Sequence, residues 1–319
     1  MKKYYKYLMA CLLVGEILTS CGTDLEPEVF PNRSIDEIEA YPLTAASSPS
    51  EFRRIFVSDK EVYYYTWEMG NQLIACNFTD GQKRDVDLSV TEEELANLQN
   101  LLNAGNGELG GSCWYEGKGY VVGLEKTYIY NPETSEWSVV SNDCRDIVNY
   151  MDKGTSNVVV RGNDMIQISS RRIFSFSLDS YRWTYQPITH DFMYNGSASL
   201  ICDGSNLYAI NDSESILYIY EEATNLWKEK ESFLDNDFFG SPAKILVDGN
   251  VFYLISSNSS FARQWDSSNN AVTLLNMESL YSHSYTYSSD LTEMFNVKST
   301  GYILGYDGSM TYLMKFNLK

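Results

Sequence analysis

Aromatic side chains with basic side chains nearby are the residues of this sequence best suited to hold a ligand. The chain of 319 residues contains 25 tyrosines, and aromatic residues make up 14% of it. Aromatic rings stack on sugar rings or anchor a protein partner, and Arg and His add hydrogen bonds. Any one of these rings is more simply explained as filling a gap in the fold. As a set, we expect one ligand-binding surface to collect Trp67, His190, Phe192, Tyr194, Tyr281, Tyr285, Tyr287, Arg171 and Arg172, with Arg145 nearby.

Catalytic signatures are weak by comparison. The two histidines, His190 and His283, lie in separate segments, and with the tyrosines they match no arrangement of copper ligands. A glycine-rich stretch, residues 105–111, follows a predicted helix and lacks the lysine of a phosphate-binding loop. We therefore predict no catalytic residue, no metal site and no cofactor, and we favour a protein that is not an enzyme.

Acidic residues outnumber basic ones, 43 to 24. Neighbouring carboxylates, such as Glu221 with Glu222 or Asp235 with Asp237, are therefore expected on solvated faces, and they lack the spacing of a calcium loop. Binding of phosphate groups needs clustered Lys and Arg. We predict that nucleic acid is not a partner.

The elements that must position the aromatic residues are repeated along the chain. The stretch "YIYNPETSEW" places an aromatic residue seven positions before a tryptophan, after a turn. Weaker relatives surround Cys76 and Phe316. The same spacing joins Tyr130 with Trp137, Phe176 with Trp183, Tyr220 with Trp227, and Trp265 with Val272.

A second pattern precedes each copy: a strand, a turn rich in Gly and Asp, and a second strand that usually begins with an aromatic residue. Successive units lie 57, 46, 42, 45 and 49 residues apart, which is the period of a β-propeller blade. Asp-Gly and Gly-Asn turns close tight hairpins, and the tryptophan on the outer strand can wedge between neighbouring blades. The aligned positions are Tyr63, Tyr120, Ile166, Tyr208, Tyr253 and Tyr302.

Each unit therefore reads as a four-stranded antiparallel sheet that cannot bury its faces alone, and six such sheets closed in a ring can. The copy "YNPETSEW" resembles the kelch family, whose blades carry a Tyr and, six or seven positions later, a Trp. The paired glycines of that family are missing, since only Gly123 remains in blade two. We predict an all-β, kelch-like, six-bladed β-propeller over residues 36–319.

Two segments stand outside the regular repeat. The last unit is too short to hold its outer strand, so we predict that residues 36–46 supply this strand and close the ring. A helix could compete there, because Ser34 and Glu37 fit a capping box that Pro42 would end. Residues 91–105 are predicted to form one short inserted helix between blades one and two, capped by Thr91 and stopped by Gly105.

The first twenty residues are predicted to be an export signal, because a basic start precedes an apolar run too short to span a bilayer. Residues 18–21, "LTSC", resemble the lipobox of bacterial lipoproteins, in which the cysteine, here Cys21, is acylated. Glu16 departs from that pattern, and an ordinary cleaved signal is the alternative. The resemblance implies a protein anchored in the outer membrane of a bacterial envelope, periplasmic or surface-exposed, with residues 21–35 as a tether.

Loss of residues 1–20 would remove three Lys and one Glu, which leaves 21 basic and 42 acidic residues and a net charge of −21. Anionic lipid would repel such a chain, so the acyl group alone would hold it at the membrane. Export permits disulfides, but buried free thiols are at least as compatible with the sequence. The cysteines concerned, which fit no metal motif and allow three pairings, are Cys76, Cys113, Cys144 and Cys202.

Two functions fit this sequence. The first is a monomeric, non-catalytic binding module that presents one aromatic-rich face to a glycan or an envelope protein. The second comes from the family resemblance: some six-bladed kelch-like proteins are sugar mutarotases, which implies an enzyme with its site in the central funnel. Arg161 and Glu116, on predicted innermost strands, are the residues expected there. A perturbed carboxylate beside an Arg in a deep pocket would favour catalysis.

Overall fold

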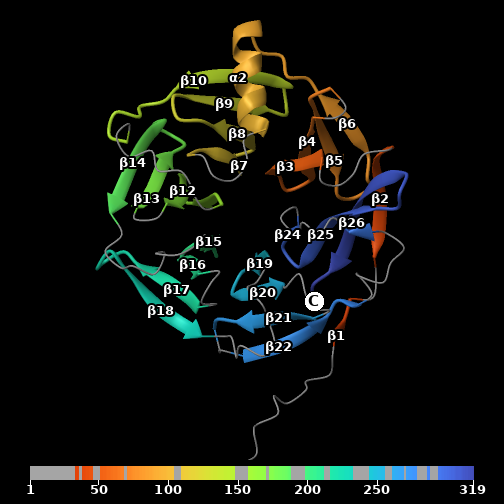
Figure 1. Cartoon of the computed structure of the whole chain (residues 1–319), viewed down its shortest axis with the longest axis vertical. Helices are drawn as coiled ribbons and strands as arrows, with labels where there is room; N and C mark the ends of the chain where they lie inside the picture. Colours follow the sequence, from red (N-terminus) through yellow and green to blue (C-terminus); the bar gives the residue numbers. More distant parts are fainter. Residues whose placement is uncertain are drawn as a thin grey trace, which may run out of the picture. The chain divides into compact units, whose positions relative to one another are not determined.

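In a computed structural model, six antiparallel sheets are arranged as blades around a ring, which is the architecture of a β-propeller (Figure 1). Residues Ser34–Lys319 form one compact unit. The structure describes residues 33–35, 38–45, 51–67, 70–103, 109–147, 157–169, 172–187, 198–211, 216–232, 244–255, 261–268, 271–278, 286–287 and 294–319.

Each blade runs from an inner strand to an outer strand at the rim (Figure 1). Blade 1 consists of β3 (Phe52–Val57), β4 (Glu61–Thr66), β5 (Gln72–Asn77) and β6 (Lys83–Val86). Blade 2 consists of β7 (Gly111–Tyr115), β8 (Lys118–Val122), β9 (Lys126–Asn131) and β10 (Glu136–Ser141). Blade 3 consists of β11 (Val159–Arg161), β12 (Asp164–Ser169), β13 (Arg172–Ser177) and β14 (Arg182–Pro187).

Blades 4 to 6 repeat this order, and two-residue strands, β1 (Arg33–Ser34) and β23 (Thr286–Tyr287), extend the sheets of blades 5 and 6. Blade 4 consists of β15 (Ala198–Cys202), β16 (Leu207–Asn211), β17 (Ile216–Glu221) and β18 (Leu226–Ser232). Blade 5 consists of β19 (Lys244–Asp248), β20 (Val251–Ile255), β21 (Phe261–Asp266) and β22 (Ala271–Asn276). Blade 6 consists of β24 (Phe295–Val297), β25 (Thr300–Tyr306), β26 (Met310–Asn317) and β2 (Glu39–Ala45).

The seven-residue spacing marks the hairpin of the third and fourth strands. Trp137 lies directly opposite Tyr130, and the other three pairs of the repeat are cross-strand partners in the same way. Four residues form the turn between the strands, and the last of them is left-handed in blades 2, 3 and 4. The φ angles are 57° at Ser135, 54° at Tyr181 and 55° at Asn225. The six aligned positions of the second strands are all buried, which confirms the six units.

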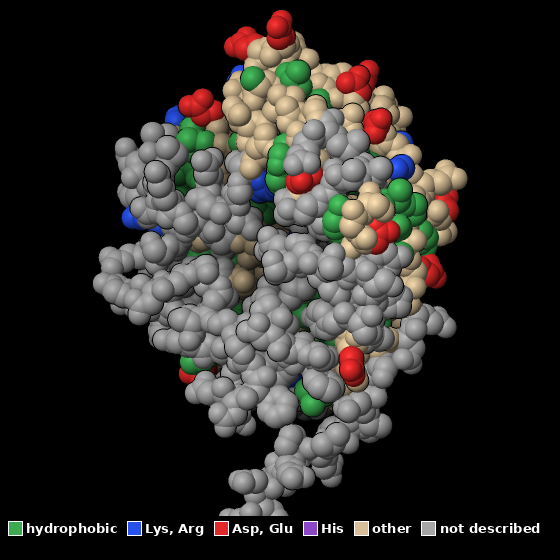
Figure 2. Space-filling model, turned by 45° about the vertical axis from the view of Figure 1, so that its right-hand side comes forward, with side chains coloured by type: hydrophobic (Ala, Val, Ile, Leu, Met, Phe, Trp, Pro, Cys, Tyr) green, Lys and Arg blue, Asp and Glu red, His purple; other side chains and the backbone are tan. Residues whose placement is uncertain are grey.

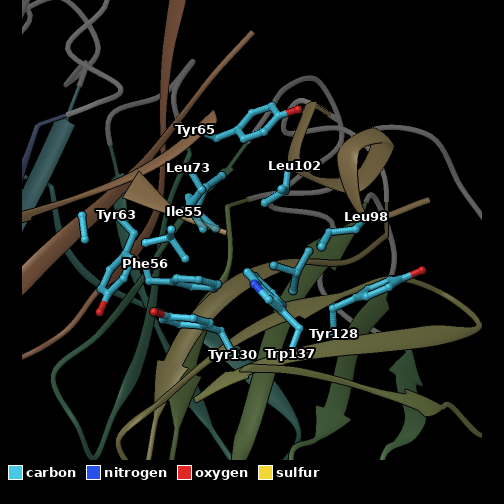
Figure 3. Packing of buried hydrophobic residues seen from close by; sticks show 13 residues of the cluster. Ile55, Phe56, Tyr63, Tyr65, Leu73, Leu98, Leu102, Tyr128, Tyr130 and Trp137 are labelled. Carbon is cyan, nitrogen blue, oxygen red and sulfur yellow. The ribbon is translucent and has the colours of Figure 1, made fainter. Parts of the chain in front are cut away.

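The tryptophans of the outer strands reach back to the preceding blade, as predicted. Trp137 donates its Nε1–H to the carbonyl of Asp87 in blade 1 at 2.9 Å, and Trp183 donates to Gly123 of blade 2 at 3.2 Å. Figure 3 shows Trp137 packed among residues of blades 1 and 2. The buried residues form six clusters, one for each pair of neighbouring blades, including blades 6 and 1. The core of this protein therefore lies between blades.

The ring is closed by β2, which pairs antiparallel with β26 from Glu39 opposite Lys315 to Ala45 opposite Met310. The observed strand lies within the predicted range 36–46. Pro42 stands at an irregularity of the register, where the lack of an N–H is tolerated at an outer strand. Lys315 Nζ also lies 3.1 Å from Glu39 Oε2.

The inserted helix α2 (Glu92–Asn103) begins directly after Thr91, whose carbonyl accepts the N–H of Glu94 at 3.0 Å. The predicted end at Gly105 lies outside the described residues. Leu98 and Leu102 are buried between blades 1 and 2 (Figure 3). No helix within the described part of the chain is both long and apolar enough to cross a membrane.

Side-chain hydrogen bonds fasten neighbouring inner strands to one another. The amide of Asn157 bonds both backbone groups of Leu200 in blade 4, at 2.7 and 2.9 Å. Asn296 in blade 6 bonds both backbone groups of Val247 in blade 5, at 3.2 and 2.7 Å. An amide side chain thus replaces a strand partner where the inner strands diverge. Polar groups near the ring centre therefore hold blades in place.

Among the described residues, Cys76, Cys113, Cys144 and Cys202 are free thiols, and Cys76 and Cys113 are buried. Burial raises the pKa of each of these two thiols to about 12. Both thiols therefore stay protonated at neutral pH, so they behave as small apolar side chains.

Candidate functional site

The antiparallel order of strands sends the turns of every blade to two faces. One face holds the turns between the first and second strands and between the third and fourth strands of each blade, and we call it the hairpin face. The opposite, connection face holds the turns between second and third strands and the links between blades. On the connection face, Trp67 follows β4 and is 42% exposed, and Arg172 begins β13 and is partly buried. Arg145, in the link between blades 2 and 3, pairs with Asp143 at 2.7 Å.

These three residues lie on one face but come from different blades. Tyr287 is placed in β23, where its backbone lies opposite Gly305. The remaining predicted residues lie outside the described part of the chain: Cys21, Arg171, His190, Phe192, Tyr194, Tyr281, His283 and Tyr285.

A groove of about 340 Å³ opens on the hairpin face between blades 3 and 4. We call it the blade 3–4 groove. One lining residue comes from the end of β11, and the others come from two turns and the outer half of blade 4. The lining residues are Arg161, Ser205, Asn206, Ile219, Tyr220, Glu221, Glu222 and Lys228.

Arg161 is held at the groove by an ion pair with Glu222, whose Oε1 lies 2.7 Å from Nη2. The side chain of Arg161 is 24% exposed and that of Glu222 is 68% exposed. An ion pair this open to water contributes about 0–1 kcal/mol. A ligand can therefore displace Glu222 at little cost.

Tyr220 spans the two blades, because its hydroxyl donates to Gln186 Oε1 of β14 at 2.8 Å. Burial raises the pKa of this tyrosine, so it remains a neutral donor. Lys228 pairs with Glu221 at 2.7 Å, and the pKa of Glu221 is lowered by Lys228 and by Thr224. The groove thus offers two carboxylates, two cations and a phenol.

The equivalent corner between blades 1 and 2 is closed by Arg84. Strand register identifies the equivalence: Tyr63, Ala75 and Arg84 lie opposite one another in blade 1. Ile166, Ser175 and Thr184 do so in blade 3. Two residues before Tyr63 stands Glu61, and two residues before Ile166 stands Asp164.

Arg84 bonds four oxygen atoms of three side chains in its corner. Its Nη2 and Nε lie 2.9 and 3.3 Å from the two carboxylate oxygens of Glu61, and it donates to the hydroxyls of Tyr63 and Tyr130 at 3.2 Å each. Burial raises the pKa of Glu61, but hydrogen bonds from Arg84 and Tyr63 outweigh it and leave this pKa lowered. Such a forked contact both orients and neutralises the carboxylate.

Thr184 is too short to do this in blade 3, and it is exposed. Asp164 therefore has a half-buried carboxylate without the guanidinium that its equivalent Glu61 has. Burial raises the pKa of Asp164, and the charge of Arg161 offsets only part of this rise. Ser175 and Thr184 thus place only small, uncharged side chains at the positions that Ala75 and Arg84 occupy in blade 1.

The sequence predicts Glu116 and Arg161 on innermost strands. Glu116 is not on an innermost strand, so that prediction is wrong: β7 ends at Tyr115, and Glu116 forms the following turn with a φ of 45°. A left-handed turn residue was not recognisable without the register. Arg161 does lie on an innermost strand, β11, but it turns to Glu222 of blade 4.

The closed ring of four-stranded blades places this chain in the class of β-propeller proteins. Among solved structures it is similar to one described as YCF48 bound to D1 peptide, with 10% identity, a TM-score of 0.54, and coverage of 90% of this chain and 100% of that one. Another is YCF48 from Cyanidioschyzon merolae, with 13% identity, a TM-score of 0.47, and coverage of 85% and 84%. No protein-family model and no curated protein matches the sequence. The likeness supports the fold alone, and the kelch resemblance stays a prediction.

Proposed function

We propose that this β-propeller is a non-catalytic binding module for a protein partner, and that the blade 3–4 groove takes a basic side chain of that partner. The difference between the two equivalent corners carries the proposal. Arg84 stands beside Glu61 in one corner, and the shorter, uncharged Thr184 takes its place in the other, on the blade that carries Asp164. A guanidinium or ammonium group of the partner would stand where Arg84 stands in blade 1.

Electrostatics supports a basic ligand. A cation next to Asp164 favours its ionised form and so recovers part of the energy that burial costs this carboxylate. Glu222 is loosely held and can turn from Arg161 to the ligand. The net charge of −19 attracts basic partners over longer distances.

A similar propeller supports a protein partner over a glycan, because the YCF48 structure is described as bound to a D1 peptide. The connection face, where Trp67 is exposed, stays the surface on which the sequence predicts stacking with a glycan or a protein. Both faces of one ring can bind, and the variants of Thr184 below test the blade 3–4 groove on the hairpin face.

The test uses the tripeptide acetyl-Gly-Arg-Gly-amide and its Gln analogue, titrated into the full chain by calorimetry. We expect only the Arg peptide to bind, and Thr184→Arg to weaken it about tenfold or more, because the new side chain occupies the groove. Thr184→Val, which leaves the groove open, should bind as the unchanged protein does. Equal binding of both peptides, or equal binding by Thr184→Arg, would refute the proposal.

A sugar-active enzyme is the second candidate, and one observation favours it. Asp164, with its raised pKa, stands near Arg161, and this combination is common at acid–base sites. Polarimetry of freshly dissolved α-D-glucose would show accelerated mutarotation that Asp164→Asn abolishes. Absence of acceleration by the unchanged protein would remove this candidate and leave the binding proposal untouched.

We further propose that the protein is exported to a bacterial envelope, where a lipid on Cys21 anchors it in the membrane and residues 21–35 act as a tether. Support comes from the sequence "LTSC" and the basic, then apolar, start. Substitution of Cys21→Ser should move the protein from the membrane fraction to the soluble fraction. If the variant remains with the membranes to the same extent, the anchor is not this cysteine.

A further inference from the structure

The rim of blade 2 ends in a strand with few charges. After Glu136, the outer strand β10 consists of Trp137, Ser138, Val139, Val140 and Ser141. The side chain of Val139 is 38% exposed. An outer strand with unpaired backbone groups and β-branched residues readily pairs with another chain, so proteins usually protect such edges.

Three other rims show the usual protection by charge or proline. Strand β6 carries Lys83 and Arg84, and β18 alternates Lys228, Glu229 and Lys230. Strand β2 contains Pro42 at a register irregularity. These features disfavour an added strand.

The two remaining rims, on β14 and β22, are covered by the chain itself. Asp143 donates its N–H to the carbonyl of Tyr181 at 2.8 Å and accepts the N–H of Trp183 at 2.9 Å, in a parallel bridge. Ile35 donates its N–H to the carbonyl of Asn276 at the end of β22, at 3.1 Å. The protein therefore already uses added backbone segments on two of its blades.

The free hydrogen-bonding groups of β10 follow from its register. Asn142 donates its N–H to Glu125 and so continues the ladder between β9 and β10. Alternation then directs the backbone groups of Trp137, Val139 and Ser141 away from β9. Trp137 is the equivalent of Trp183, whose N–H is bonded to Asp143 in blade 3. Among the described residues, no strand pairs with this side of β10.

We propose that the outer edge of β10 docks an extended, basic segment of a protein partner, which adds a fifth strand to blade 2. Main-chain hydrogen bonds to Trp137, Val139 and Ser141 would give the affinity, as in other cases of strand addition. This surface is separate from the blade 3–4 groove, and the proposal does not depend on the groove.

Charge complementarity favours a basic segment over an acidic one as the strand that docks on β10. Exposed Glu133 and Glu136 flank one end of the edge, and exposed Glu125 and Glu93 lie near Lys126 at the other end. Lys126 itself is paired with Glu94. Figure 2 shows acidic side chains gathered at the projecting end of α2. A second copy of this chain, with its net charge of −19, would set acidic ends against each other.

The test measures binding of the fluorescent peptide acetyl-Lys-Thr-Val-Arg-Val-Thr-Lys-amide to the full chain by anisotropy. Val139→Pro removes an outward N–H and leaves the β9 ladder intact, so we expect binding to weaken about tenfold or more. Val139→Thr keeps that N–H and should bind within about twofold of the unchanged protein. Thr184→Arg, which fills the blade 3–4 groove, should leave the affinity unchanged. Circular dichroism would show that the variants are folded.

A second measurement stands even if Val139→Pro lowers stability. An N-methyl group on one peptide valine that faces the edge should abolish binding to the unchanged protein, because it removes a backbone donor. The proposal is overturned if the basic peptide does not bind, if a peptide with Glu at the three basic positions binds equally, or if N-methylation has no effect. Sedimentation as a dimer that Val139→Pro converts to a monomer would show that a second copy covers the edge, and it would overturn the choice of partner.

Discussion

Glu61 and Asp164 occupy equivalent positions in blades 1 and 3, yet their pKa values shift in opposite directions. Burial acts on both carboxylates, but hydrogen bonds from Arg84 and Tyr63 lower the pKa of Glu61, whereas the pKa of Asp164 is raised. Two residues make the difference, because Thr184 replaces Arg84 and Ile166 replaces Tyr63 at the same rung of the ladder. A repeated fold thus allows a structural ion pair and a candidate ligand site to be compared within one chain.

The comparison also separates stability from binding. In the closed corner, Arg84 bonds the hydroxyls of Tyr63 and Tyr130 across blades 1 and 2, and both tyrosines belong to the buried cluster shown in Figure 3. In the open corner, Arg161 has an exposed counter-ion that a ligand can replace. Substitutions in the first corner should therefore act mainly on unfolding, and substitutions in the second mainly on binding.

The largest expected effect comes from Arg84→Ala. This change leaves the carboxylate of Glu61, whose side chain is 21% exposed, without its forked partner. We expect it to lower the free energy of unfolding by about 1–3 kcal/mol in urea titrations at pH 7. The control Arg161→Ala should cost less than about 1 kcal/mol, because the carboxylate it leaves behind is solvated.

At acidic pH, the difference in free energy of unfolding between the Arg84→Ala variant and the unchanged protein should decrease. The folded pKa of Glu61 is lowered, so the stability that its ionised form contributes is present above its ordinary pKa of 4.5 and is lost as the pH falls through the folded value. Urea titrations repeated at lower pH would show this convergence. A deficit that is independent of pH would mean that Arg84 acts through packing, and the contrast with Asp164 would not be electrostatic.

The second largest effect is a gain in stability, which we expect from Thr184→Arg. Placing a guanidinium beside Asp164 rebuilds the closed corner in blade 3, and we expect the free energy of unfolding to rise by up to about 1 kcal/mol. The double variant with Asp164→Asn should lose this gain. A Thr184→Arg protein that is less stable than the unchanged one would show that the two corners are not geometrically equivalent.

The repeat made the architecture predictable. Trp137 stands seven positions after Tyr130 because four turn residues separate cross-strand partners, and this local rule appears directly in the chain. Closure by residues 36–46 could be predicted from a missing strand, since an open ring would leave an edge and an unfilled wedge. The turn at Glu116 could not, because it depends on one left-handed residue.

The blade 3–4 groove was much harder to foresee. Arg161 and Glu222 are distant in sequence, and only the packing of blades 3 and 4 brings them within 2.7 Å. Glu222 was expected to be a solvated charge, which its exposure agrees with, but its partner had no sequence signal. An alignment of the repeats could have revealed the difference between the two corners, because Arg84 and Thr184 fall at the same position of their units.

The smallest effect tests the open corner itself, through Asp164→Asn. The folded pKa of Asp164 is raised above its ordinary value of 3.8, so its contribution to stability is complete below that pH and is lost as the pH rises through the folded value. Asparagine cannot ionise, so the variant should equal the unchanged protein in acid and exceed it slightly at pH 7, by well under about 1 kcal/mol. With the Arg tripeptide bound, the unchanged protein should be more stable at pH 7 than the Asp164→Asn variant, because a bound cation favours ionised Asp164. The affinity of this peptide for the unchanged protein should also increase with pH. An affinity that stays constant with pH and is unaffected by Asp164→Asn would leave the groove without the carboxylate on which a basic ligand depends.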